Sequence, residues 1–414
     1  MRKMSEMPYH IGLVLKMYPS HLQKRIVAVN DGVKRAVYNL LVASNNEIYR
    51  MKKTADFVPV YRERIAYLCS VTSSTAGIKQ ALPFLQEKLV DSLAVDNAYR
   101  NYHTAWKNQK ERHTGVPVFK KKSYEQSYQT NAHYYKDGRS NVRFDDVDHI
   151  TLPVLKRVRI GGPKELIHAL MHRKADTRIG SVKIWKDSVG EYWVSLSIAS
   201  EEPFHEPLKK TGSAHGIDLN LIDLINDSDG SSAENRHFYK KTEEKLAKAQ
   251  RKLSRMAEQS KKEKRPLKGS KNYQKQRIRV AKLNRQTARQ RKDYLHVLSK
   301  REVENQDFIA AENLKVSNLL KNHHLAKAVA DASWRTFLTM LQYKAGFYGK
   351  TVILVPSKNT TQTCSACGYV LKGEQKLTLA DREWVCPNCG TKHLRDTNAA
   401  TVILQRGLET AGRS

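Results

Sequence analysis

Four cysteines near the carboxyl end of this 414-residue chain have the spacing of a metal site. Cys364 and Cys367 form one Cys-x-x-Cys pair, Cys386 and Cys389 form a second, and 18 residues separate the two pairs. Two pairs at this separation are typical of a zinc ribbon with four thiolate ligands. Because four thiolates fill a tetrahedral shell, we expect a structural Zn²⁺ with no open position for catalysis. Disulfides are the alternative, and a basic, cysteine-poor chain disfavours them.

Three carboxylates, Asp218, Glu312 and Asp396, each stand at the edge of an apolar segment. An unpaired charge is costly there unless a metal ion or a basic partner neutralises it. Hydrolysis of a phosphodiester is well served by two divalent cations, one generating hydroxide and one stabilising the leaving alkoxide. Hard cations such as Mg²⁺ need several oxygen ligands. An RNase H-type fold brings carboxylates together from its first strand, a later strand and a helix, so these three predict a magnesium-dependent catalytic site.

Each carboxylate has a simpler explanation when it is taken singly. Asp218 could be an ordinary residue at the end of a strand, and Glu312 with Asn313 could cap a turn. Asp396 could be the N-cap of the last helix. The order of the three, with the cysteines between the second and the third, favours the metal site. Three nearby aspartates are assigned to solvent or turns: Asp223, Asp307 and Asp381.

The net charge of +32 at pH 7 predicts a polyanionic partner. Nucleic acid is favoured over a membrane surface, because no run approaches the about 18 apolar residues that span a bilayer. The N-terminus also lacks the apolar core of a secretory signal. Cys69 is the one cysteine outside the two pairs, which fits a reducing compartment, and we expect it to be a small buried residue. A protein of a reducing compartment such as the cytoplasm is therefore expected.

Residues 236–301 are the most basic stretch, with 24 lysines and arginines against five acidic residues. Pro266 and Gly269 divide the stretch into two helices, and a thin apolar seam runs along it. A helical hairpin of this kind needs a polyanion to lie against, and a solvated surface helix is the alternative. The candidate nucleic-acid contacts are Lys271, Lys275, Arg277, Arg279, Lys282, Arg285 and Arg289.

A second set of candidate contacts is Lys120, Lys121 and Lys122, which aromatic residues surround. Aromatic side chains can stack on bases while lysines hold phosphates. The alternative is that the aromatics belong to a core and the lysines to solvent. The aromatic residues are Trp106, Phe119, Tyr124, Tyr128, Tyr134 and Tyr135.

In the first half of the chain, a strand over residues 9–17 precedes a helical block of about 100 residues. The block is expected to include a helix that begins near residue 84. From residue 115 short strands follow, including residues 116–119, and the clearest hairpin pairs residues 181–185 with 192–198. The simplest topology is a small β-barrel, partly closed by the first strand, with a helical insert.

The second half begins with a linker over residues 201–212 and a strand over 216–222. A strand ending at Glu312, a helix over 333–348 and a strand over 351–355 follow the basic helices. The fold class predicted for the chain is multidomain α+β and α/β.

Several motifs in this order resemble the TnpB family, the nucleases of bacterial insertion sequences that are related to miniature type V CRISPR effectors. The motifs are Pro117-Val118-Phe119-Lys120-Lys121-Lys122, Gly216-Ile217-Asp218-Leu219, Lys268-Gly269-Ser270-Lys271-Asn272-Tyr273, Ala311-Glu312-Asn313-Leu314, Gln362-Thr363-Cys364-Ser365-Ala366-Cys367-Gly368 and Arg395-Asp396-Thr397-Asn398-Ala399-Ala400. The likeness runs over nearly the whole chain.

The resemblance implies a wedge β-barrel from residues 1–18 and 112–205 that carries a helical recognition insert, residues 19–111. It implies an RNase H-like RuvC nuclease from residues 206–358 and 393–414, interrupted by a zinc ribbon over 359–392 that binds target nucleic acid. Asp218, Glu312 and Asp396 would hold catalytic magnesium, as two ions. The basic helices, about residues 241–301, would lie against a heteroduplex of guide RNA and target, where the protein reads shape and base pairing reads sequence.

The partners implied are a guide RNA from the end of the element and double-stranded target DNA cut next to a short motif. The protein is expected to be monomeric with its RNA, with a dimer as the alternative. Two departures from the family pattern stand out: Asn220 replaces the usual glycine after Asp-Leu, and residues 356–362 differ from the usual Thr-Ser-Gln. A strand-transfer transposase and a binding-only DNA regulator are the alternative functions.

Overall fold

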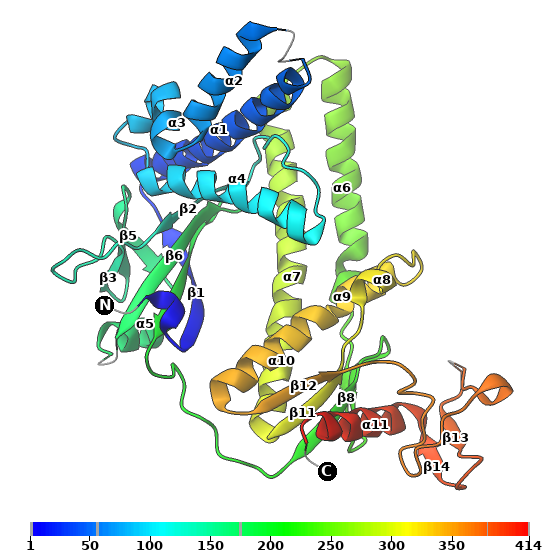
Figure 1. The fold of residues 1–414 in the computed structure, drawn as a ribbon. Coiled ribbons are helices and arrows are strands. Elements are labelled where there is room, and N and C mark those ends of the chain that lie inside the picture. Colours follow the sequence, from blue (N-terminus) through cyan, green and yellow to red (C-terminus); the bar gives the residue numbers. More distant parts are fainter. Residues whose placement is uncertain (1–2, 55–57, 174–175, 379, 413–414) are drawn as a thin grey trace. The chain divides into compact units, whose positions relative to one another are not determined.

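The computed structural model describes residues 3–54, 58–173, 176–378 and 380–412. It divides into two compact units of mixed α and β structure, Met1–Phe204 and His205–Ser414 (Figure 1). In the described part of the chain, no helix is long and apolar enough to cross a membrane.

A seven-stranded antiparallel sheet forms the centre of the first unit, in the order β2-β6-β7-β1-β5-β4-β3. Its strands are β1 Tyr9–Tyr18, β2 Gln126–Asn131, β3 Arg143–Asp146, β4 His149–Leu152, β5 Lys156–Gly161, β6 Thr177–Lys186 and β7 Tyr192–Ser200. The first strand pairs with β7 on one side and with β5 on the other. Alternate residues of these strands, such as Leu13, Leu15 and Met17, point into a single core. The predicted strand 9–17 and the predicted hairpin are confirmed, and the sheet has its edges at β2 and β3.

The helical block lies between β1 and β2 in the sequence, as predicted. It consists of α1 His21–Lys52, α2 Pro59–Thr72, α3 Thr75–Ala81, the 3-10 turn η2 Pro83–Gln86 and α4 Ser92–Arg112, while α5 Lys164–Met171 follows β5 and the short turn η1 Met4–Glu6 precedes β1. The side chain of Ser20 accepts a hydrogen bond from Gln23 N, and the Gln23 side chain accepts one from Ser20 N. This capping box explains why α1 begins where it does.

Three local predictions for the first unit are wrong. The helix expected from residue 84 begins at Ser92, because Asp91 caps it at Leu93 N and Asn30 bonds the backbone of Asp91 and Leu89. Residues 116–119 form no strand. The backbone of the neighbouring Lys120 bonds at both its N–H and its carbonyl to the side chain of Asn39.

Cys69 is exposed on α2, whereas its neighbour Leu68 is buried. The prediction that Cys69 is buried is wrong, because consecutive residues of a helix point about 100° apart. The apolar face of α2 therefore passes through Leu68 and leaves Cys69 outside it.

The second unit contains a five-stranded sheet in the order β10-β9-β8-β11-β12. Its strands are β8 Ala214–Asp218, β9 Asp223–Asp227, β10 Ser232–Glu234, β11 Phe308–Glu312 and β12 Thr351–Val355. The central strand β8 is parallel to β11, which is parallel to β12, whereas β9 and β10 continue the sheet in antiparallel fashion. The predicted strand 216–222 ends earlier, at Asp218, because the Asn220 side chain accepts hydrogen bonds from Ile222 N and Asp223 N and makes a turn.

Helices cover both faces of this sheet. The helices of the second unit are α6 Phe238–Lys262, η3 Leu267–Gly269, α7 Lys271–Asn305, α8 Val316–Leu319, α9 Ala326–Ala332, α10 Trp334–Tyr348 and α11 Arg395–Thr410. Ile217, Ile309 and Ala311 pack in one core with α7 and α10. Phe308 and Ala310 pack in another core with α11. Alternation along β8 and β11 therefore gives the sheet one face toward α7 and α10 and one toward α11.

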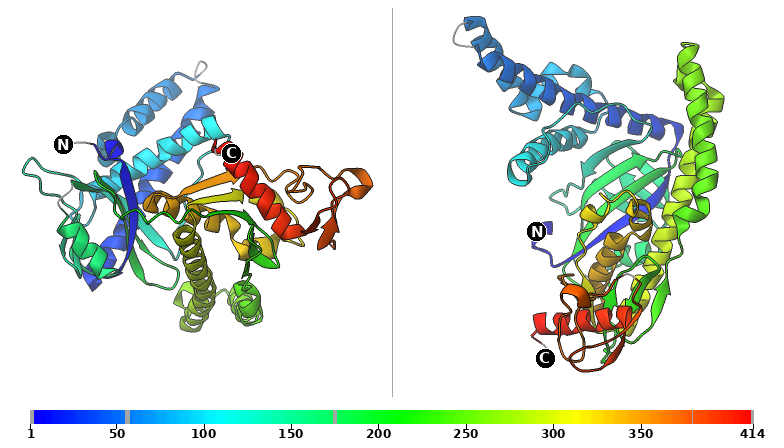
Figure 2. Two further views of the ribbon diagram at one scale, coloured as in Figure 1. Left: turned by 90° about the horizontal axis from the view of Figure 1, so that it is seen from below. Right: turned by 90° about the vertical axis from the view of Figure 1, so that its right-hand side faces the viewer.

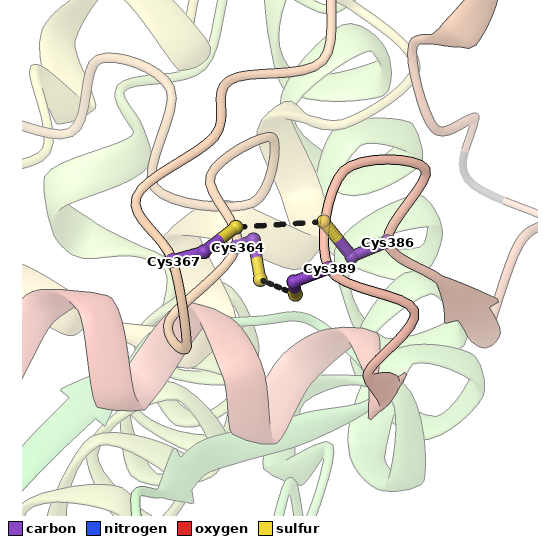
Figure 3. Close-up of side chains that lie close together, drawn as sticks. All are labelled: Cys364, Cys367, Cys386 and Cys389. Atoms are coloured by element: carbon purple, nitrogen blue, oxygen red, sulfur yellow. Dashed lines mark hydrogen bonds between the residues drawn. The ribbon is translucent and has the colours of Figure 1, made fainter.

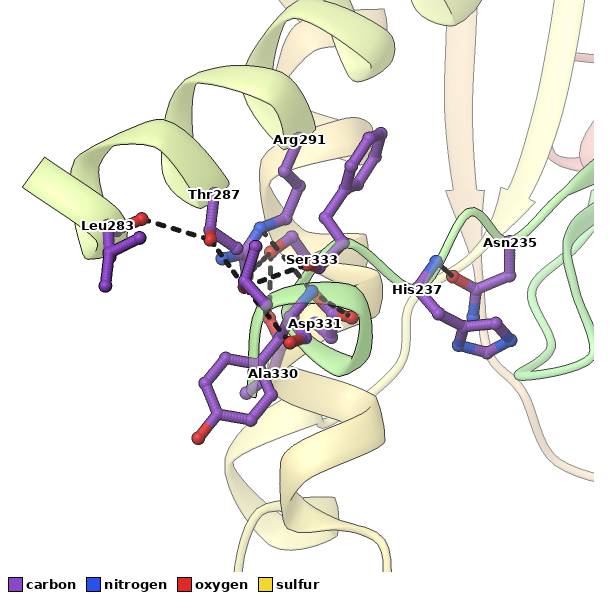
Figure 4. A network of polar contacts seen from close by, with 11 residues as sticks. Asn235, His237, Leu283, Thr287, Arg291, Ala330, Asp331 and Ser333 are labelled. Atoms are coloured by element: carbon purple, nitrogen blue, oxygen red, sulfur yellow. Dashed lines mark hydrogen bonds and ion pairs between the residues drawn. The ribbon is translucent and has the colours of Figure 1, made fainter. Parts of the chain in front are cut away.

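The two basic helices lie side by side as a hairpin, as predicted (Figures 1 and 2). A polar network fixes the base of this hairpin (Figure 4). The Asp331 carboxylate accepts hydrogen bonds from Tyr239 N at 3.0 and 3.1 Å, and Arg291 donates to Ala330 O at 2.7 Å. The hydroxyls of Thr242 and Thr287 lie 2.8 Å apart between α6 and α7. The hairpin is thus attached by specific bonds, in keeping with its thin apolar seam.

Candidate active site and metal centre

Strand pairing brings Asp218 and Glu312 together. Ile217 on β8 is opposite Ala311 on β11 in the parallel register, so the next residue of each strand ends at the same edge of the sheet. Asp218 shares its face with Gly216, and Glu312 shares its face with Ala310, which is the face that α11 covers. The two side chains are 6% and 5% exposed. Two carboxylates are thus buried next to one another at the carboxyl ends of parallel strands.

Asp396 reaches this edge because α11 packs directly on β8. A Cβ added to Gly216 would lie 1.9 Å from the carbonyl oxygen of Ala400, so the helix could not come this close to a larger residue. Asp396 is one helical turn before Ala400, in the first turn of α11 and just after its N-cap, Leu394. It is part-exposed and pairs with Arg395 Nε at 2.9 Å and with Arg382 at 3.4 Å.

The electrostatics of the site oppose a full negative charge. Burial, followed by repulsion from Glu312 and Asp396, raises the pKa of Asp218 to about 8, and Arg395 lowers it. Burial also raises the pKa of Glu312, whereas a hydrogen bond from the Thr360 hydroxyl and the charge of Arg406 lower it. Burial raises the pKa of both carboxyls, and the neighbouring charges raise that of Asp218 further, so a bound cation would stabilise their ionised forms. The oxygen-only donor set fits a hard divalent cation of the Mg²⁺ type.

Four neighbours of this site were missed by sequence reasoning. Thr360, Arg395 and Arg406 act on the carboxylates as described. Asn226 on β9 is opposite Asp218 in the β8–β9 pair, and its buried Nδ2 has no hydrogen-bond partner. Arg395 could have been noticed because it adjoins Asp396, and Thr360 lies in the segment that departs from the family pattern. The pairing that places Asn226 has no signal in the sequence.

The sulfur atoms of the four cysteines converge (Figure 3). Cys364 Sγ lies 3.7 Å from Cys389 Sγ, and Cys367 Sγ lies 3.7 Å from Cys386 Sγ. A tetrahedral zinc with bonds of about 2.3 Å would separate its sulfurs by about 3.8 Å, whereas a disulfide needs about 2.05 Å. The cluster therefore fits a four-thiolate zinc site. His393 Nε2 lies 3.1 Å from Cys364 Sγ, beside this set of ligands.

The segment that contains the cysteines is attached to α11 through Asn398, which lies two residues after Asp396. It contains the short strands β13 Glu383–Val385 and β14 Lys392–Leu394 and the turn η4 Gly373–Gln375. Asn398, 3% exposed, donates to Thr363 O at 2.7 Å and accepts from Ser365 N at 2.9 Å. The same helix thus carries Asp396 and holds the first cysteine turn.

Of the three aspartates that were predicted to lie in solvent or turns, Asp307 instead links separate segments of the second unit. Asp381 does close a turn by accepting from Thr378, and Asp223 begins β9. Asp307, by contrast, accepts hydrogen bonds from Thr211 N and Gly212 N and pairs with Lys350. It joins the linker before β8 to the segment before β12, so its assignment to solvent or an ordinary turn is wrong.

The candidate nucleic-acid contacts lie in two places. Five residues of α7 are exposed, namely Lys271, Lys275, Arg279, Lys282 and Arg289, and two are part-buried, Arg277 and Arg285. Lys120, Lys121 and Lys122 are exposed in the segment before β2, with Lys120 Nζ 4.9 Å from the centre of the Tyr38 ring. The surrounding aromatics divide: Tyr128 is in the core, whereas Phe119, Tyr124 and Tyr135 are exposed.

Two family models match the chain. The model described as "Cas12f1-like, TNB domain" matches residues 334–403, which contain the cysteines and Asp396. The model OrfB_IS605, described as "Probable transposase", matches residues 195–323, which contain Asp218 and Glu312.

Known proteins resemble the chain over most of its length. A Streptomyces pristinaespiralis protein named "Putative RNA-guided DNA endonuclease" is 30% identical over 403 residues, covering 95% of this chain and 88% of the relative. An Escherichia coli K12 protein named "Putative RNA-guided DNA endonuclease InsQ" is 26% identical over 392 residues, covering 91% and 87%. The solved structure described as "Cryo-EM structure of the Cas12f1-sgRNA-target DNA complex" is similar with a TM-score of 0.47 at 14% identity, covering 95% of this chain and 98% of that chain.

Proposed function

We propose, from the premise that the chain belongs to the TnpB family of RNA-guided DNA endonucleases, that it cuts double-stranded DNA at sites selected by a guide RNA. The observation that carries this proposal is the buried carboxylate set, in which Asp218 and Glu312 end two parallel strands and α11 brings Asp396 to the same edge. A site of this kind does chemistry with divalent cations, which a purely DNA-binding regulator does not need.

In this proposal Asp218, Glu312 and Asp396 hold two Mg²⁺ ions. When bound, such ions supply a hydroxide nucleophile and stabilise the leaving alkoxide. The Thr360 hydroxyl fixes one oxygen of Glu312, and Arg395 fixes one oxygen of Asp396. These bonds orient the remaining carboxylate oxygens, and the Thr360 hydrogen bond lowers the pKa of Glu312 against the effect of burial.

The domain assignment remains part of the proposal. Residues 1–18 and 112–205 would be the wedge domain, 19–111 the recognition insert, and 206–358 with 393–414 the RuvC nuclease. Residues 359–392 would be the zinc ribbon that contacts the target. The division of the chain between residues 204 and 205 supports the boundary between the wedge domain and the RuvC nuclease.

The basic hairpin supplies the guide-binding surface in this proposal. Its exposed lysines and arginines suit a duplex backbone, because an RNA–DNA duplex held in this way is recognised by shape and phosphates. The guide RNA would come from the end of the mobile element, and the protein would act on chromosomal DNA in the cytoplasm as a monomer with its RNA.

The test is to express the chain with its native flanking DNA and to sequence the RNA that co-purifies. One discrete RNA that runs past the element end, together with Mg²⁺-dependent linear products from a plasmid carrying the matching target, is the expected result. A scatter of cellular RNA and no cutting of the matched plasmid would contradict the proposal. Joined products between two DNA molecules would favour the transposase instead.

A further inference from the structure

A second group of metal-ligating side chains lies in the second unit, on the sheet face opposite the catalytic carboxylates. His215 on β8 points toward α7, because it alternates with Gly216, which faces α11. Asp227 is opposite Ile217 in the β8–β9 pair and therefore shares this face. Glu302 on α7 completes the group. One ligand atom from each of the three residues lies within 4.8 Å of the others.

Buried polar atoms without partners concentrate at this place. Asp227 is 1% exposed and Glu302 is 3% exposed. Asp227 Oδ1, His215 Nδ1 and Gln306 Oε1 are buried and have no hydrogen-bond partner. An unpaired buried polar atom costs about 1–3 kcal/mol, and more when it is charged. Two of these atoms, Asp227 Oδ1 and His215 Nδ1, belong to the group of three ligands, which indicates that a ligand is needed there.

The surrounding groups hold the outer side of each ligand and leave the inner side open. Arg301 bonds Glu302 at Oε1, at 2.8 and 3.1 Å, and Oε2 lies 3.7 Å from His215 Nδ1, beyond hydrogen-bond length. Ser231 donates to Asp227 Oδ2 at 2.9 Å, on the other side from the unpartnered Oδ1. Two carboxylates and an imidazole thus present lone pairs to a common point.

We propose that His215, Asp227 and Glu302 bind a divalent first-row transition cation of the Zn²⁺ or Mn²⁺ type. An imidazole with two carboxylates is a donor set for such ions, whereas Mg²⁺ and Ca²⁺ favour oxygen alone. Bonds of about 2.0–2.2 Å place two ligands of one ion about 3–4.4 Å apart, so small side-chain rotations suffice to close the site.

The orientation of the imidazole agrees with this assignment. His215 Nε2 lies 3.3 Å from Asp229 Oδ2 and 3.1 Å from Gln306 Nε2. Rotating the Gln306 amide by 180° places its unpartnered Oε1 there, where it can accept from an Nε2–H. A proton on Nε2 would be held by the Asp229 carboxylate, which leaves the lone pair of Nδ1 for the metal. A carboxylate behind a metal-bound histidine is the usual arrangement. The ion would join β8, β9 and the end of α7, and so fix the strand that carries Asp218 three residues later.

The first test compares the metal content of full-length proteins after equilibration with Zn²⁺ and removal of loosely bound ions. The variants are Asp227→Asn and Glu302→Gln, which preserve shape, and the control is Glu304→Gln, an exposed residue of α7 that pairs with Lys300. We expect wild type and Glu304→Gln to retain one more Zn²⁺ per chain than the two variants do. Equal zinc content in all four proteins would overturn the proposal. Zinc bound at the cysteines or at Asp218 would be present in all four proteins, so it does not affect the difference in zinc content between them.

A second measurement needs no variant to fold. The wild-type chain, labelled with ¹⁵N-histidine and loaded with ¹¹³Cd²⁺, is examined by NMR. We expect one cadmium signal from the cysteines and a second, outside the range of sulfur coordination, that couples to a histidine nitrogen. The catalytic carboxylates cannot give this coupling, because they contain no nitrogen ligand. A spectrum without any histidine-coupled signal outside the sulfur range would overturn the proposal.

Discussion

At the scale of single residues, the proposed activity depends on carboxylates that are costly to bury in their charged form. Burial and the neighbouring charges of Glu312 and Asp396 raise the pKa of Asp218 to about 8, so the folded protein without cations tends to keep this group protonated. The site therefore favours the binding of a cation. Substitution of Asp218 should reduce catalysis more than it reduces the stability of the fold.

Asp218→Asn removes the charge and keeps the shape of the side chain. We expect cleavage of a guide-matched plasmid to fall by about 10³-fold or more, since metal stabilisation of the transition state is worth several kcal/mol. Guide and target binding should persist, and the melting temperature should not fall, because a buried charge has been removed. A cleavage assay with a gel-shift measurement decides this, and cleavage at the wild-type rate would contradict the assignment.

Thr360→Val tests the hydrogen bond that orients Glu312. The variant keeps the volume of the side chain and loses the hydroxyl, so Glu312 can rotate away from its metal-binding position. We expect the Mg²⁺ concentration for half-maximal cleavage to rise about tenfold, which is the usual scale for losing such a supporting bond. Thr360→Ser should restore the wild-type value, and a variant with unchanged Mg²⁺ dependence would show that the bond has no such role.

Residue types in the sequence were sufficient to name the three carboxylates and the four cysteines as candidates. They could not reveal Thr360 or Asn226, because both reach the site through the three-dimensional course of a loop and a strand pair. His215 and Glu302 are 87 positions apart and belong to no recognisable spacing, so their meeting follows only from the packing of α7 on β8.

At the scale of elements, local side-chain bonds determine where helices and strands end. The periodic apolar pattern correctly predicted β11, α10 and β12, whose sequences are strongly patterned. It placed the start of α4 too early, because it could not include the long-range bonds from Asn30 to the backbone near residue 90. The strand predicted at residues 116–119 is absent for a similar reason. The side chain of Asn39 bonds the backbone of the neighbouring Lys120, which is therefore not available for strand pairing.

Asp307 shows how one side chain joins three elements of the second unit. Lys350 and two backbone N–H groups hold the pKa of Asp307 below its usual range. Because the folded-state pKa is lowered, the stabilisation is complete above the unfolded value of about 3.9 and is lost as the pH falls through the folded value. Asp307→Asn should therefore lower the free energy of unfolding at neutral pH, with a difference from wild type that shrinks below about pH 4.

Urea unfolding at a series of pH values measures this difference. Asp293→Asn, on the exposed surface of α7, is the matched control and should follow wild type throughout. A difference between Asp307→Asn and wild type that stays constant down to pH 3 would mean that the carboxylate charge is not what stabilises the junction.

Cys386→Ser removes a buried ligand of the cysteine site. We expect the purified protein to lose its ribbon zinc, because structural zinc contributes directly to the folding of such modules. Since Asn398 couples this segment to the helix that carries Asp396, cleavage should fall as well. Cys69→Ser, on the exposed surface of α2, is the control and should keep both zinc and activity. Unchanged zinc content in Cys386→Ser would contradict a four-thiolate site.

At the scale of the whole molecule, the charge of +32 is distributed so that part of it forms a stripe. The exposed residues Lys271, Lys275, Arg279 and Lys282 of α7 follow one another at spacings of four, four and three, which places them on one side of the helix. A solvated helix would alternate the sign of its charges, as the pair Lys300–Glu304 does at the end of α7. A stripe of one sign suits a line of phosphates.

The last prediction tests whether this stripe binds the guide-containing duplex. Each lysine that contacts a phosphate releases about one counterion, so neutralising two should reduce the slope of log K against log salt by about two. We expect this for Lys275→Gln with Lys282→Gln, measured on the RNA–DNA duplex between low and physiological salt. The control, Lys107→Gln with Lys300→Gln, removes the same charge from lysines already paired with Glu111 and Glu304. Equal slopes for the two double variants would mean that only net charge matters. A smaller slope for the Lys275 and Lys282 variant alone would locate the duplex on the stripe.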